Sequence, residues 1–471
     1  MAAQGKINQW NVPEIVPATL FRAYDIRGPV TSEALTPGLA YAVGLSIGSE
    51  AREQGQKAIV VGRDGRLSGP KLTAALIQGL CETGLAVLNF GLVPTPLVYF
   101  ATNRLETNSG VMVTASHNPG HHNGFKIVLN GKTLRSEEIA TIRTRILERR
   151  FVKGHGAVVD VDIIEDYESY ITKHIQLDRP LKVVVDCGNG IAGKVAPALY
   201  RKLGCEVVEL FCEVDGHFPN HHPDPTIPAN LTDLIHKVKE TQADLGLAFD
   251  GDADRLGIVT DKGEIIWPDR QMMLFSMDVL SRLPGSDIVF DVKCSRSLAE
   301  IIKKYGGNPG RWRTGHSILK AKLFEIGAPL AGEMSGHIFF KDEWFGFDDG
   351  IYVGARLLRI ISQTNQRTSE IFAELPDSVN TPELKLPMTE EKKQPFMQAL
   401  LKKADFGNAK LITIDGLRVE FEDGWGLIRP SNTSPYLILR FEADTEEKLK
   451  RIQEIFRTQL RMIDNALELP F

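Results

Sequence analysis

A unit of strand, polar loop and helix recurs three times along the chain, and this pattern constrains the fold more than any other feature of the sequence. Apolar runs at residues 57–61, 182–186 and 288–292 are each followed by a polar loop and then by residues with helical spacing. The three units lie more than a hundred residues apart. They therefore predict α/β domains of similar build rather than a short-period solenoid.

The composition changes after about residue 376. Residues 381–393 are rich in Pro, Glu and Lys, which predicts a linker. Residues 393–403 have the pattern of an amphipathic helix, in which Pro395 is acceptable only in the first turn. This last part is expected to form a separate, smaller α+β domain. Its predicted strands and closing helix are at residues 411–414, 417–421, 425–428, 436–441 and 445–462.

Length and composition limit the classes of protein to consider. The chain has 471 residues, enough for roughly three domains of about 150 residues and a small fourth. Its 55 Lys and Arg against 60 Asp and Glu give a net charge of −5, which does not favour nucleic acid or anionic lipid as a partner. No apolar run reaches the ~20 residues of a membrane span, and the five cysteines lack CxxC spacing. We expect a cytoplasmic protein without a membrane partner; the sequence does not decide the oligomeric state, and a monomer is the working expectation.

Ser116 lies in the motif Thr-Ala-Ser-His-Asn-Pro at residues 114–119, just after an apolar run. Pro119 keeps the preceding residue out of helical geometry, so we expect Ser116 on an exposed turn, where it could be a nucleophile. Local sequence alone favours an ordinary polar turn, because short motifs give many false matches and no Gly-x-Ser-x-Gly elbow is present. If the segment is extended, the neighbouring His117 points away from Ser116.

Three carboxylates alternate in the loop Asp-Gly-Asp-Ala-Asp-Arg that starts at Asp250. Asp250, Asp252 and Asp254 can converge on one hard divalent cation. A calcium loop of the EF-hand type needs Gly at its sixth and Glu at its twelfth position, where this chain has Arg255 and Asp261. Magnesium fits better, because it takes few carboxylates and completes its shell with water or phosphate oxygen. The alternative is a solvated acidic turn, but three acids between buried strands repel one another unless a cation joins them.

Two further loops carry groups suited to a sugar or a phosphate. Residues 332–337, Gly-Glu-Met-Ser-Gly-His, place Glu and Ser between glycines, although alone this pattern is best explained as a Gly-rich turn. Residues 429–435, Arg-Pro-Ser-Asn-Thr-Ser-Pro, offer the guanidinium, hydroxyl and amide donors that a phosphate requires, and a hydrophilic hairpin loop explains them equally well. Basic residues beside the four loops, each explained singly as a solvated side chain, are Arg27, Arg63, Arg66, Lys126, Arg255 and Lys293.

Taken together, the four loops resemble the signature loops of the α-D-phosphohexomutase family. TASHNP, DGDADR, GEMSGH and RPSNTSP occur in that order over residues 114–435, and FRAYDIRG at Phe21 and GRDGRLSG at Gly62 are similar to family motifs too. The resemblance therefore covers nearly the whole chain. GEMSGH resembles the phosphomannomutase/phosphoglucomutase branch, whereas phosphoglucosamine mutases typically carry a different residue in place of Met334. Ala253 stands where glycine is common, and a small residue there leaves the metal ligands intact.

The resemblance implies three similar mixed-sheet α/β domains plus a smaller C-terminal α+β domain around a central cleft, each giving one loop. The domains expected on this basis are residues 1–161 with the phosphoserine loop, 162–264 with the metal loop, 265–376 with the sugar-recognition loop and 377–471 with the phosphate-binding loop.

The resemblance also implies roles for individual side chains. The serine, as its phosphate ester, is donor and acceptor of phosphate, and the three aspartates with one phosphoserine oxygen hold Mg²⁺. A histidine or a lysine moves the proton of the sugar hydroxyl, and an imidazole near its reference pKa of ~6.5 suits that step. Cationic side chains offset the repulsion of two phosphates in one cleft. The implied catalytic residues are Ser116, His337, Lys126 and Arg27, and the implied metal ligands are Ser116, Asp250, Asp252 and Asp254. The implied substrate-binding residues are Tyr24, Arg255, Lys293, His316, Glu333, Met334, Ser335, Gly336, Arg429, Ser431, Asn432 and Thr433.

The implied reaction moves phosphate between O1 and O6 of a hexose, mannose or glucose, through a phosphoserine and a hexose 1,6-bisphosphate. Mg²⁺ and catalytic amounts of the bisphosphate, as activator, are the expected cofactors, and small phosphosugars the expected partners. The alternatives are a phosphoglucosamine mutase of the same family, a metal-dependent sugar phosphatase and a non-catalytic sugar-phosphate sensor. A phosphatase more often uses an aspartate as nucleophile, and a sensor needs neither an exposed serine nor a proton carrier. The sequence does not decide between mannose and glucose, nor the pathway, nor which group is the base in each half-reaction.

Overall fold

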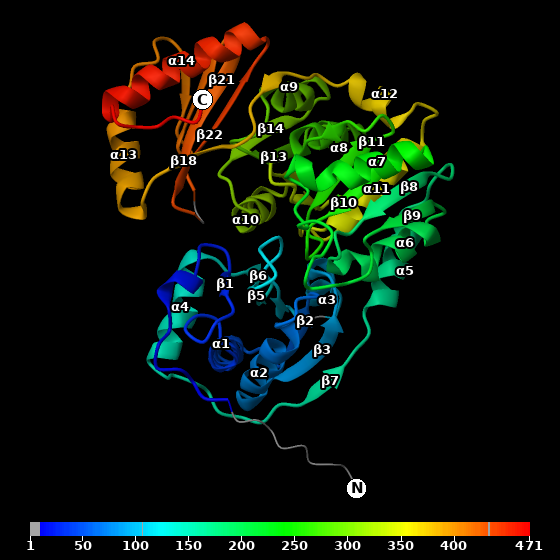
Figure 1. Cartoon of the computed structure of the whole chain (residues 1–471). Helices are drawn as coiled ribbons and strands as arrows, with labels where there is room; N and C mark the ends of the chain where they lie inside the picture. Colours follow the sequence, from blue (N-terminus) through cyan, green and yellow to red (C-terminus); the bar gives the residue numbers. More distant parts are fainter. Residues whose placement is uncertain (1–9, 106, 432–433) are drawn as a thin grey trace. The chain divides into compact units, whose positions relative to one another are not determined.

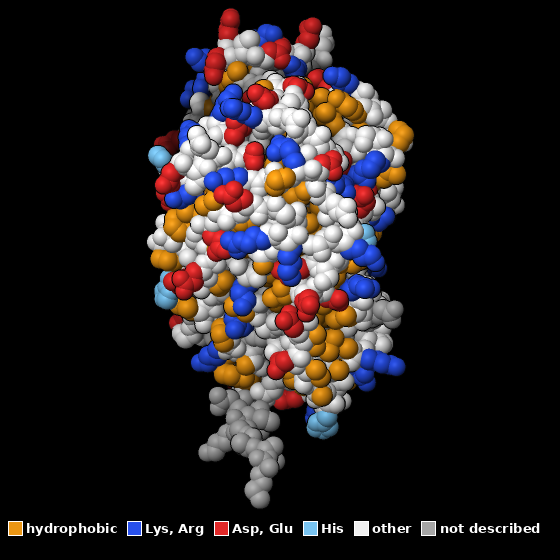
Figure 2. Space-filling view, turned by 90° about the vertical axis from the view of Figure 1, so that its right-hand side faces the viewer, with side chains coloured by type: hydrophobic (Ala, Val, Ile, Leu, Met, Phe, Trp, Pro, Cys, Tyr) orange, Lys and Arg blue, Asp and Glu red, His pale blue; other side chains and the backbone are white. Residues whose placement is uncertain are grey.

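The computed structural model describes residues 10–105, 107–431 and 434–471 (Figure 1). The chain divides into two compact units, Met1–Trp267 with Ser335–Glu370, and Pro268–Met334 with Ile371–Phe471. Among the described residues, no helix is long and apolar enough to cross a membrane. On the face shown in Figure 2, acidic and basic side chains are interspersed, in keeping with a net charge of only −5.

The first sheet of the first unit is mixed. Its strand order is β1-β5-β4-β2-β3-β7, with β6 paired to β5. The strands are β1 (Ile26–Pro29), β2 (Ala58–Arg63), β3 (Ala86–Leu92), β4 (Gly110–Val113), β5 (His122–Leu129), β6 (Lys132–Thr133) and β7 (Val158–Asp160). The helices are η1 (Ala18–Leu20), α1 (Pro37–Glu53), α2 (Gly69–Glu82), α3 (Thr95–Arg104) and α4 (Ser136–Leu147). Strand β2 runs parallel to β3 and β4, whereas β5 is antiparallel to β1 and β4. Parallel strands require crossover helices, which is why α2 and α3 alternate with β2, β3 and β4 along the chain.

The second sheet of this unit has the order β12-β11-β10-β8-β9. Its strands are β8 (Lys182–Asp186), β9 (Glu206–Leu210), β10 (Leu245–Phe249), β11 (Leu256–Thr260) and β12 (Ile265–Ile266). The helical segments are α5 (Ile164–His174), η2 (Ile191–Lys194), α6 (Ala196–Lys202), η3 (Pro228–Leu231) and α7 (Thr232–Thr241), and later in the chain follow β16 (Ile338–Phe340), α11 (Gly350–Ser362) and α12 (Thr368–Ala373). Every residue of β10 is buried, because α7 and α11 both pack against this strand.

The second unit contains a parallel sheet and an antiparallel one. Strands β14 (Asn308–Trp312), β13 (Asp287–Asp291) and β15 (Leu330–Gly332) lie side by side in parallel, accompanied by α8 (Pro268–Arg282), α9 (Arg296–Lys304) and α10 (His316–Ile326). The antiparallel sheet has the order β17-β22-β21-β20-β19, with β18 also paired to β22. Its elements are β17 (Val379–Asn380), β18 (Leu384–Pro387), α13 (Glu390–Lys403), β19 (Lys410–Ile412), β20 (Leu417–Phe421), β21 (Gly424–Pro430), β22 (Tyr436–Ala443) and α14 (Glu446–Ile463).

The predicted fold class is confirmed: mixed α/β sheets are followed by a smaller α+β part at the C-terminus. The predicted linker at residues 381–393 is wrong, because β18 within it pairs antiparallel with β22. The expectation for Pro395 is also wrong, since α13 starts at Glu390 and Pro395 lies inside it, beyond the first turn. Phe396 and Leu400 of this helix are buried in the domain core, which compensates for the lost backbone hydrogen bond. The exact domain boundaries and the central cleft stay predictions.

Candidate active site

Ser116 follows the end of β4 and has a left-handed backbone conformation, with φ of 51°. Its Oγ donates a hydrogen bond of 2.7 Å to Asp250 Oδ2 and lies 3.1 Å from Nδ1 of His117. Two expectations are therefore wrong. Ser116 is not exposed, because only 3% of it is accessible, although Pro119 of the same turn is exposed. His117 does not point away from Ser116, because the backbone at Ser116 is not extended.

The acidic loop between β10 and β11 is buried. Asp250, Asp252 and Asp254 are each at most 1% exposed, and their ligand oxygens lie within 4.8 Å of one another. A Cβ at Gly251 would lie 2.4 Å from the carbonyl oxygen of Ser116, so only glycine lets the acidic loop approach the serine loop this closely. The two loops, 134 residues apart at the Ser116–Asp250 hydrogen bond, thus form one site.

Lys126, on β5, lies over the acidic loop. Its Nζ donates to Asp252 Oδ2 at 2.6 Å and also to Asp254 Oδ2, and the hydroxyl of Thr95 donates to the same Asp252 oxygen at 2.6 Å. Although burial favours the neutral amine, the two carboxylates raise the pKa of Lys126 well above its usual value. A cation of the chain itself therefore offsets part of the charge of the three acids, which the sequence pattern alone did not predict.

The three carboxylates differ in electrostatic environment. Burial raises the pKa of Asp250 to about 7, with Arg255 opposing and Asp254 adding to the shift. Burial, assisted by the charge of Asp252, likewise raises the pKa of Asp254 to about 6. For Asp252 burial is outweighed by Lys126 and by the Thr95 hydroxyl, which hold its pKa below the usual range. The loop thus contains carboxyl groups whose ionisation a divalent cation would promote.

The donor set of this loop fits Mg²⁺. Three carboxylates and one serine hydroxyl are hard oxygen ligands, and they come close enough together to share an ion. The buried oxygens Asp252 Oδ1 and Asp254 Oδ1 accept no hydrogen bond from any residue that the structure describes. Buried carboxylate oxygens are normally hydrogen-bonded or bound to a metal, so these two are the atoms that an ion would engage.

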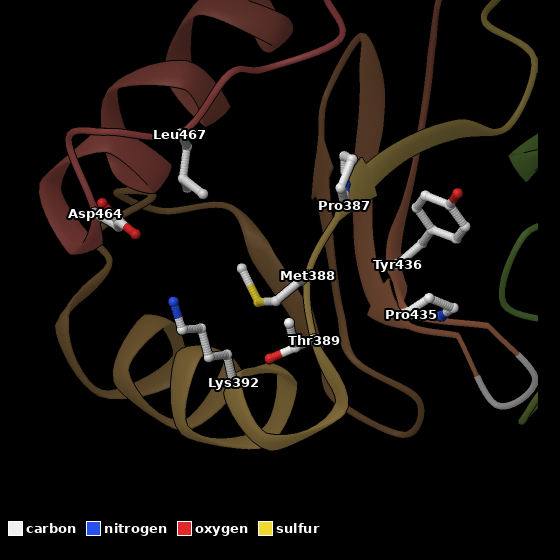
Figure 3. A pocket seen from close by; sticks show the side chains of 8 residues that line it. All are labelled: Pro387, Met388, Thr389, Lys392, Pro435, Tyr436, Asp464 and Leu467. Carbon is white, nitrogen blue, oxygen red and sulfur yellow. The ribbon is translucent and has the colours of Figure 1, made fainter. Parts of the chain in front are cut away.

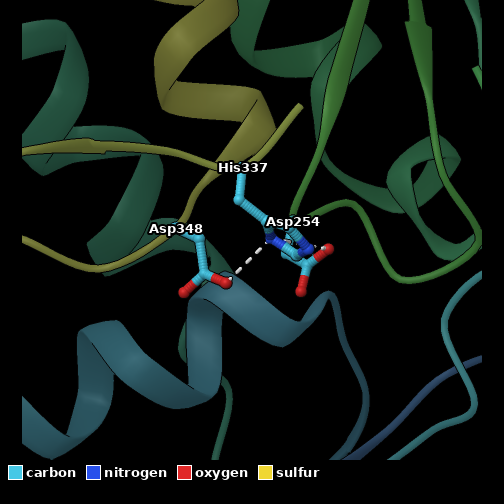
Figure 4. A group of neighbouring side chains, drawn as sticks. All are labelled: Asp254, His337 and Asp348. Carbon is cyan, nitrogen blue, oxygen red and sulfur yellow. Dashed lines mark ion pairs between the residues drawn. The ribbon is translucent and has the colours of Figure 1, made fainter. Parts of the chain in front are cut away.

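His337 comes next to the acidic loop from the third motif (Figure 4). Its Nδ1 is 3.0 Å from Asp348 Oδ2 and 3.6 Å from Asp254 Oδ1. Gly336 has φ of 98°, a conformation that residues with a side chain rarely adopt, and a Cβ at this position would lie 3.5 Å from the Cβ of Arg255. Ser335 precedes it and is half-buried. The third motif therefore supplies an imidazole to the acidic loop.

Two arginines connect the serine loop to its surroundings. Arg27 Nη1 donates to the Ala115 carbonyl at 3.2 Å and to Asn118 Oδ1 at 2.9 Å, and its other Nη pairs with Asp25. Arg255 Nε donates to Asp250 Oδ2 at 3.0 Å, while its Nη2 contacts His117 and lies 3.4 Å from Ser116 Oγ. Tyr24, near Arg27 in the chain, is half-buried. Both guanidinium groups thus lie where they can stabilise negative charge at Ser116.

The second unit holds a separate group of predicted residues. Lys293 is buried and donates to Glu383 Oε1 at 2.7 Å. Burial opposes its protonation, but Glu383, Asp291 and Glu333 raise the pKa of Lys293. Glu333 is 3% exposed and Met334 is half-buried.

Arg429, at the end of β21, shares an acidic partner with the loop before α10. Its Nε donates to Asp415 Oδ2 at 3.0 Å, and the same oxygen accepts from the backbone N–H of Thr314 at 3.0 Å. Arg429 Nη2 is buried and donates to none of the described residues. His316, two residues beyond Thr314, begins α10 and is buried. Ser431 is half-buried, and Asn432 and Thr433 lie outside the described residues.

Family models match the chain along nearly its whole length. Those of the α/β/α domains I, II and III of phosphoglucomutase/phosphomannomutase match residues 18–153, 165–263 and 267–379, and that of the C-terminal domain matches residues 383–459. A phosphomannomutase/phosphoglucomutase from Pseudomonas aeruginosa is 55% identical over 456 residues, which cover 97% of this chain and 98% of that protein. The chain belongs to the phosphoglucomutase/phosphomannomutase family. It is therefore an enzyme of the phosphohexomutase type, and the family resemblance of the four motifs is confirmed.

Other members of the phosphoglucomutase/phosphomannomutase family are similarly close. A phosphoglucomutase from Neisseria meningitidis is 50% identical over 452 residues, covering 95% of this chain and 98% of that protein. The crystal structure of a phosphoglucomutase/phosphomannomutase family protein from Burkholderia thailandensis has a TM-score of 0.93 at 49% identity and covers 97% of this chain and 100% of that one. The fold of the described residues is thus that of the family over nearly the whole chain.

Four polar residues of this family member escaped the sequence analysis. Thr95 and Asp348 contact the acidic loop and His337, and Glu383 and Asp415 pair with Lys293 and Arg429. The sequence could have identified Thr95 as a candidate site residue, because it follows the end of β3, and site residues of α/β sheets lie beyond the strand ends. No sequence pattern identified Glu383 as a site residue, because it lies in the segment interpreted as a linker.

A cavity of about 420 Å³ lies in the C-terminal part of the second unit (Figure 3). Its lining is mainly apolar, with Lys392 and Asp464 at one side. None of the predicted site residues lines it. The lining residues are Pro387, Met388, Thr389, Lys392, Pro435, Tyr436, Asp464 and Leu467.

Proposed function

We propose that this enzyme interconverts hexose 1-phosphates and hexose 6-phosphates, of mannose and of glucose, through a phosphoserine at Ser116. The observation that carries the proposal is the contact of the two loops: Ser116 Oγ donates to Asp250 at 2.7 Å, in a buried group of three carboxylates. A structural serine needs no such neighbours. A serine that carries a phosphate dianion does, because a metal held by the carboxylates offsets the charge.

Asp250, Asp252 and Asp254, with one oxygen on Ser116, are the proposed ligands of Mg²⁺. When bound there, the ion would supply positive charge to the phosphoryl oxygens during transfer. The chain itself supplies further positive charge. Arg255 Nη2 lies 3.4 Å from Ser116 Oγ, and Arg27 donates a hydrogen bond to the carbonyl of Ala115 in the serine loop. Guanidinium groups form charge-assisted hydrogen bonds with phosphate oxygens, so both arginines can stabilise the transferring group.

The proton steps are assigned to His337 and Lys126. His337, whose Nδ1 lies 3.0 Å from Asp348 Oδ2, carries an imidazole that can take up the proton of a sugar hydroxyl and return it. Lys126 has a raised pKa and is protonated at neutral pH, so it is suited to donate rather than to accept. The phosphate leaves Ser116 for the free hydroxyl, a 1,6-bisphosphate forms, and its other phosphate returns to the serine.

Residues of the second unit are proposed to recognise the substrate. Arg429 has one Nη with no acceptor among the residues described, which suits the phosphate that is not transferred. Glu333 and Lys293 are buried and polar, as a sugar-hydroxyl site requires, and Met334, His316 and Ser431 belong to the same motifs. The further members of the proposed set are Tyr24, Ser335, Gly336, Asn432 and Thr433.

A catalytic amount of hexose 1,6-bisphosphate is proposed as activator, because an enzyme that loses its serine phosphate needs a donor to regain it. The five cysteines are unpaired, which supports a reducing, cytoplasmic location. Phosphoglucosamine mutase remains the alternative inside the family; the named relatives at 50–55% identity are phosphomannomutases and phosphoglucomutases, which supports the proposal over it. A monomer stays a prediction.

One product analysis tests the proposal. The enzyme is incubated with Mg²⁺, a trace of glucose 1,6-bisphosphate and, in parallel, mannose, glucose or glucosamine 1-phosphate, with Ser116→Ala as control. We expect the 6-phosphates of mannose and glucose, and almost none with Ser116→Ala. Free phosphate would indicate a phosphatase, no product a sensor, and selective turnover of the glucosamine ester the alternative mutase.

A further inference from the structure

Arg66 is buried beneath the serine loop and is only 1% exposed. It follows β2 in the motif GRDGRLSG, which the proposed reaction does not use. Its guanidinium group donates five hydrogen bonds, and four of them go to backbone carbonyls of the segment that begins at Ser116. The bonds are Nη2 to Ser116 O at 2.7 Å and to Asn118 O at 2.6 Å, Nη1 to Pro119 O at 2.7 Å and to His122 O at 3.0 Å, and Nε to Asp64 Oδ2 at 3.1 Å.

Asp64 extends this contact to the other side of the serine. Its Oδ2 accepts from Thr114 Oγ1 at 2.7 Å, and Thr114 Oγ1 in turn accepts from the backbone N–H of Ser116 at 2.9 Å. The carbonyl of Ser116 is thus held directly by Arg66, and its amide is held through Thr114 and Asp64. Both peptide groups that flank the Cα of Ser116 are fixed by one connected network.

This network has a local consequence. Ser116 has φ of 51°, a conformation that is unfavourable for a residue with a Cβ and persists only where surrounding contacts impose it. In this conformation Oγ meets Asp250 at 2.7 Å. A relaxed, extended backbone would send the side chain to another face of the turn.

We propose that Arg66, acting with Asp64 and Thr114, is a positioning residue that imposes the left-handed conformation of Ser116 and so aims its hydroxyl at the acidic loop. The inference rests on the proposed role of Ser116 as phosphate carrier. Among the described residues, the guanidinium group of Arg66 donates to backbone carbonyls and to Asp64, and it lies 5.4 Å from the centre of the Phe218 ring. None of these contacts involves the hydroxyl of Ser116 or a carboxylate of the acidic loop. Its loss should slow the transfer step and leave the affinity for substrate unchanged.

Arg145 offers a matched control in the same unit. It is also buried, at 4% exposure, and its guanidinium group also makes several hydrogen bonds, but to Glu50, Glu53 and the carbonyl of Arg150. None of these residues belongs to the serine or the acidic loop. Replacement of either arginine by lysine keeps the charge and removes the planar fork. Arg66→Lys therefore releases the serine loop, whereas Arg145→Lys releases α1 and the carbonyl of Arg150.

The test measures kcat, the Kd for glucose 1-phosphate and the melting temperature of Arg66→Lys and Arg145→Lys. We expect Arg66→Lys to lose about tenfold to a hundredfold in kcat with Kd within about twofold of wild type, because sub-ångström misplacement of a reacting group slows transfer. Arg145→Lys should lower the melting temperature and keep kcat within about twofold. Equal kcat in both variants would overturn the proposal.

Thr114 supplies a second measurement that does not depend on the buried charge. Thr114→Val removes the acceptor of the Ser116 N–H and should lower kcat, whereas Thr114→Ser restores the hydroxyl and should recover it. If Arg66→Lys fails to fold, the comparison of Thr114→Val with Thr114→Ser tests the positioning network by itself. A wild-type kcat in Thr114→Val would then overturn the inference. Ser116→Ala is assayed in parallel and separates the two proposals. Activity of Ser116→Ala would contradict the proposed function. If Ser116→Ala is inactive while Arg66→Lys and Thr114→Val are fully active, only the positioning role of Arg66 is wrong.

Discussion

Ser116 adopts a conformation that its sequence motif did not reveal, and this conformation determines where its hydroxyl lies. The motif predicted a turn after a strand and a residue able to carry phosphate. It could not predict burial or the contact with Asp250, because both come from a loop 134 positions away and from Arg66 below. The residue types of the site were therefore predictable, whereas their contacts depended on tertiary structure.

Asp252→Asn should weaken Mg²⁺ binding at least tenfold and lower turnover by orders of magnitude, because an amide is a poorer ligand and Asp252 Oδ1 is one of the two oxygens that an ion would engage. Calorimetric titration with Mg²⁺ and a rate assay check this. Asp233→Asn, an exposed carboxylate of α7, is the matched control and should behave as wild type. Excess chelator should reproduce the loss, and full activity in chelator would refute the metal assignment.

Arg429→Ala should raise KM for 1-phosphate and 6-phosphate substrates alike, because the phosphate that is not transferred contacts the same guanidinium group in both directions. A charge-assisted hydrogen bond contributes ~1.5–3 kcal/mol, which corresponds to about a tenfold to hundredfold change in KM. Arg429→Lys should recover only part of the affinity that Arg429→Ala loses, because an ammonium group cannot bind two phosphate oxygens as a planar guanidinium group does.

The comparison needs kcat/KM for both isomers. Arg451→Ala, which removes an arginine that is 47% exposed on α14, is the control and should change neither value. A loss confined to one isomer would mean that Arg429 does not bind the shared phosphate.

Elements with a strong hydrophobic pattern were predicted well, and those with a weak pattern were not. Strand β8 has the predicted bounds, because its three consecutive valines are typical of a buried strand. Strand β18 was missed, because its Leu-Lys-Leu-Pro sequence is short and ends in proline. It forms a pair with β22 alone, where a proline is tolerated at the edge.

The start of α11 contains a buried carboxyl group whose ionisation should make stability depend on pH. Asp349 caps this helix by accepting from the Tyr352 N–H at 2.9 Å and accepts from the hydroxyl of Tyr167, and burial raises its pKa to about 7. The folded state therefore binds the proton more tightly than the unfolded state. The stability that this group contributes is full below its ordinary pKa of 3.8 and is lost as pH rises toward 7.

Asp349→Asn keeps a good helix cap and removes the charge. Its melting temperature should exceed that of wild type at pH 8 by several degrees, and the difference should shrink toward pH 5. Thermal scans at four pH values check this, with Asp233→Asn as the exposed control. A difference that does not vary with pH would show that Asp349 does not titrate in this range.

At the scale of the whole molecule, the order of the four loops along the chain was the most informative feature of the sequence. Three of the four loops, taken singly, were explained at least as well by a polar turn, and only the acidic loop was not. Their order along the chain nevertheless identified the family to which the chain belongs. Within each unit the structure then brings distant motifs together, as Ser116 with Asp250 and Arg429 with the loop of Thr314. Sequence patterns could not supply these pairings, because they carry no information on which loops meet.

If phosphate passes through Ser116 during catalysis, a pulse-chase measurement can follow it onto that residue and off again. Enzyme freed of phosphate is labelled with glucose 1,6-bisphosphate carrying radioactive phosphorus, digested and mapped, and a second portion is chased with unlabelled mannose 1-phosphate. We expect one labelled peptide, containing Ser116, and transfer of the label to sugar phosphates during the chase. Label on another residue, or release of the label only as inorganic phosphate, would contradict it.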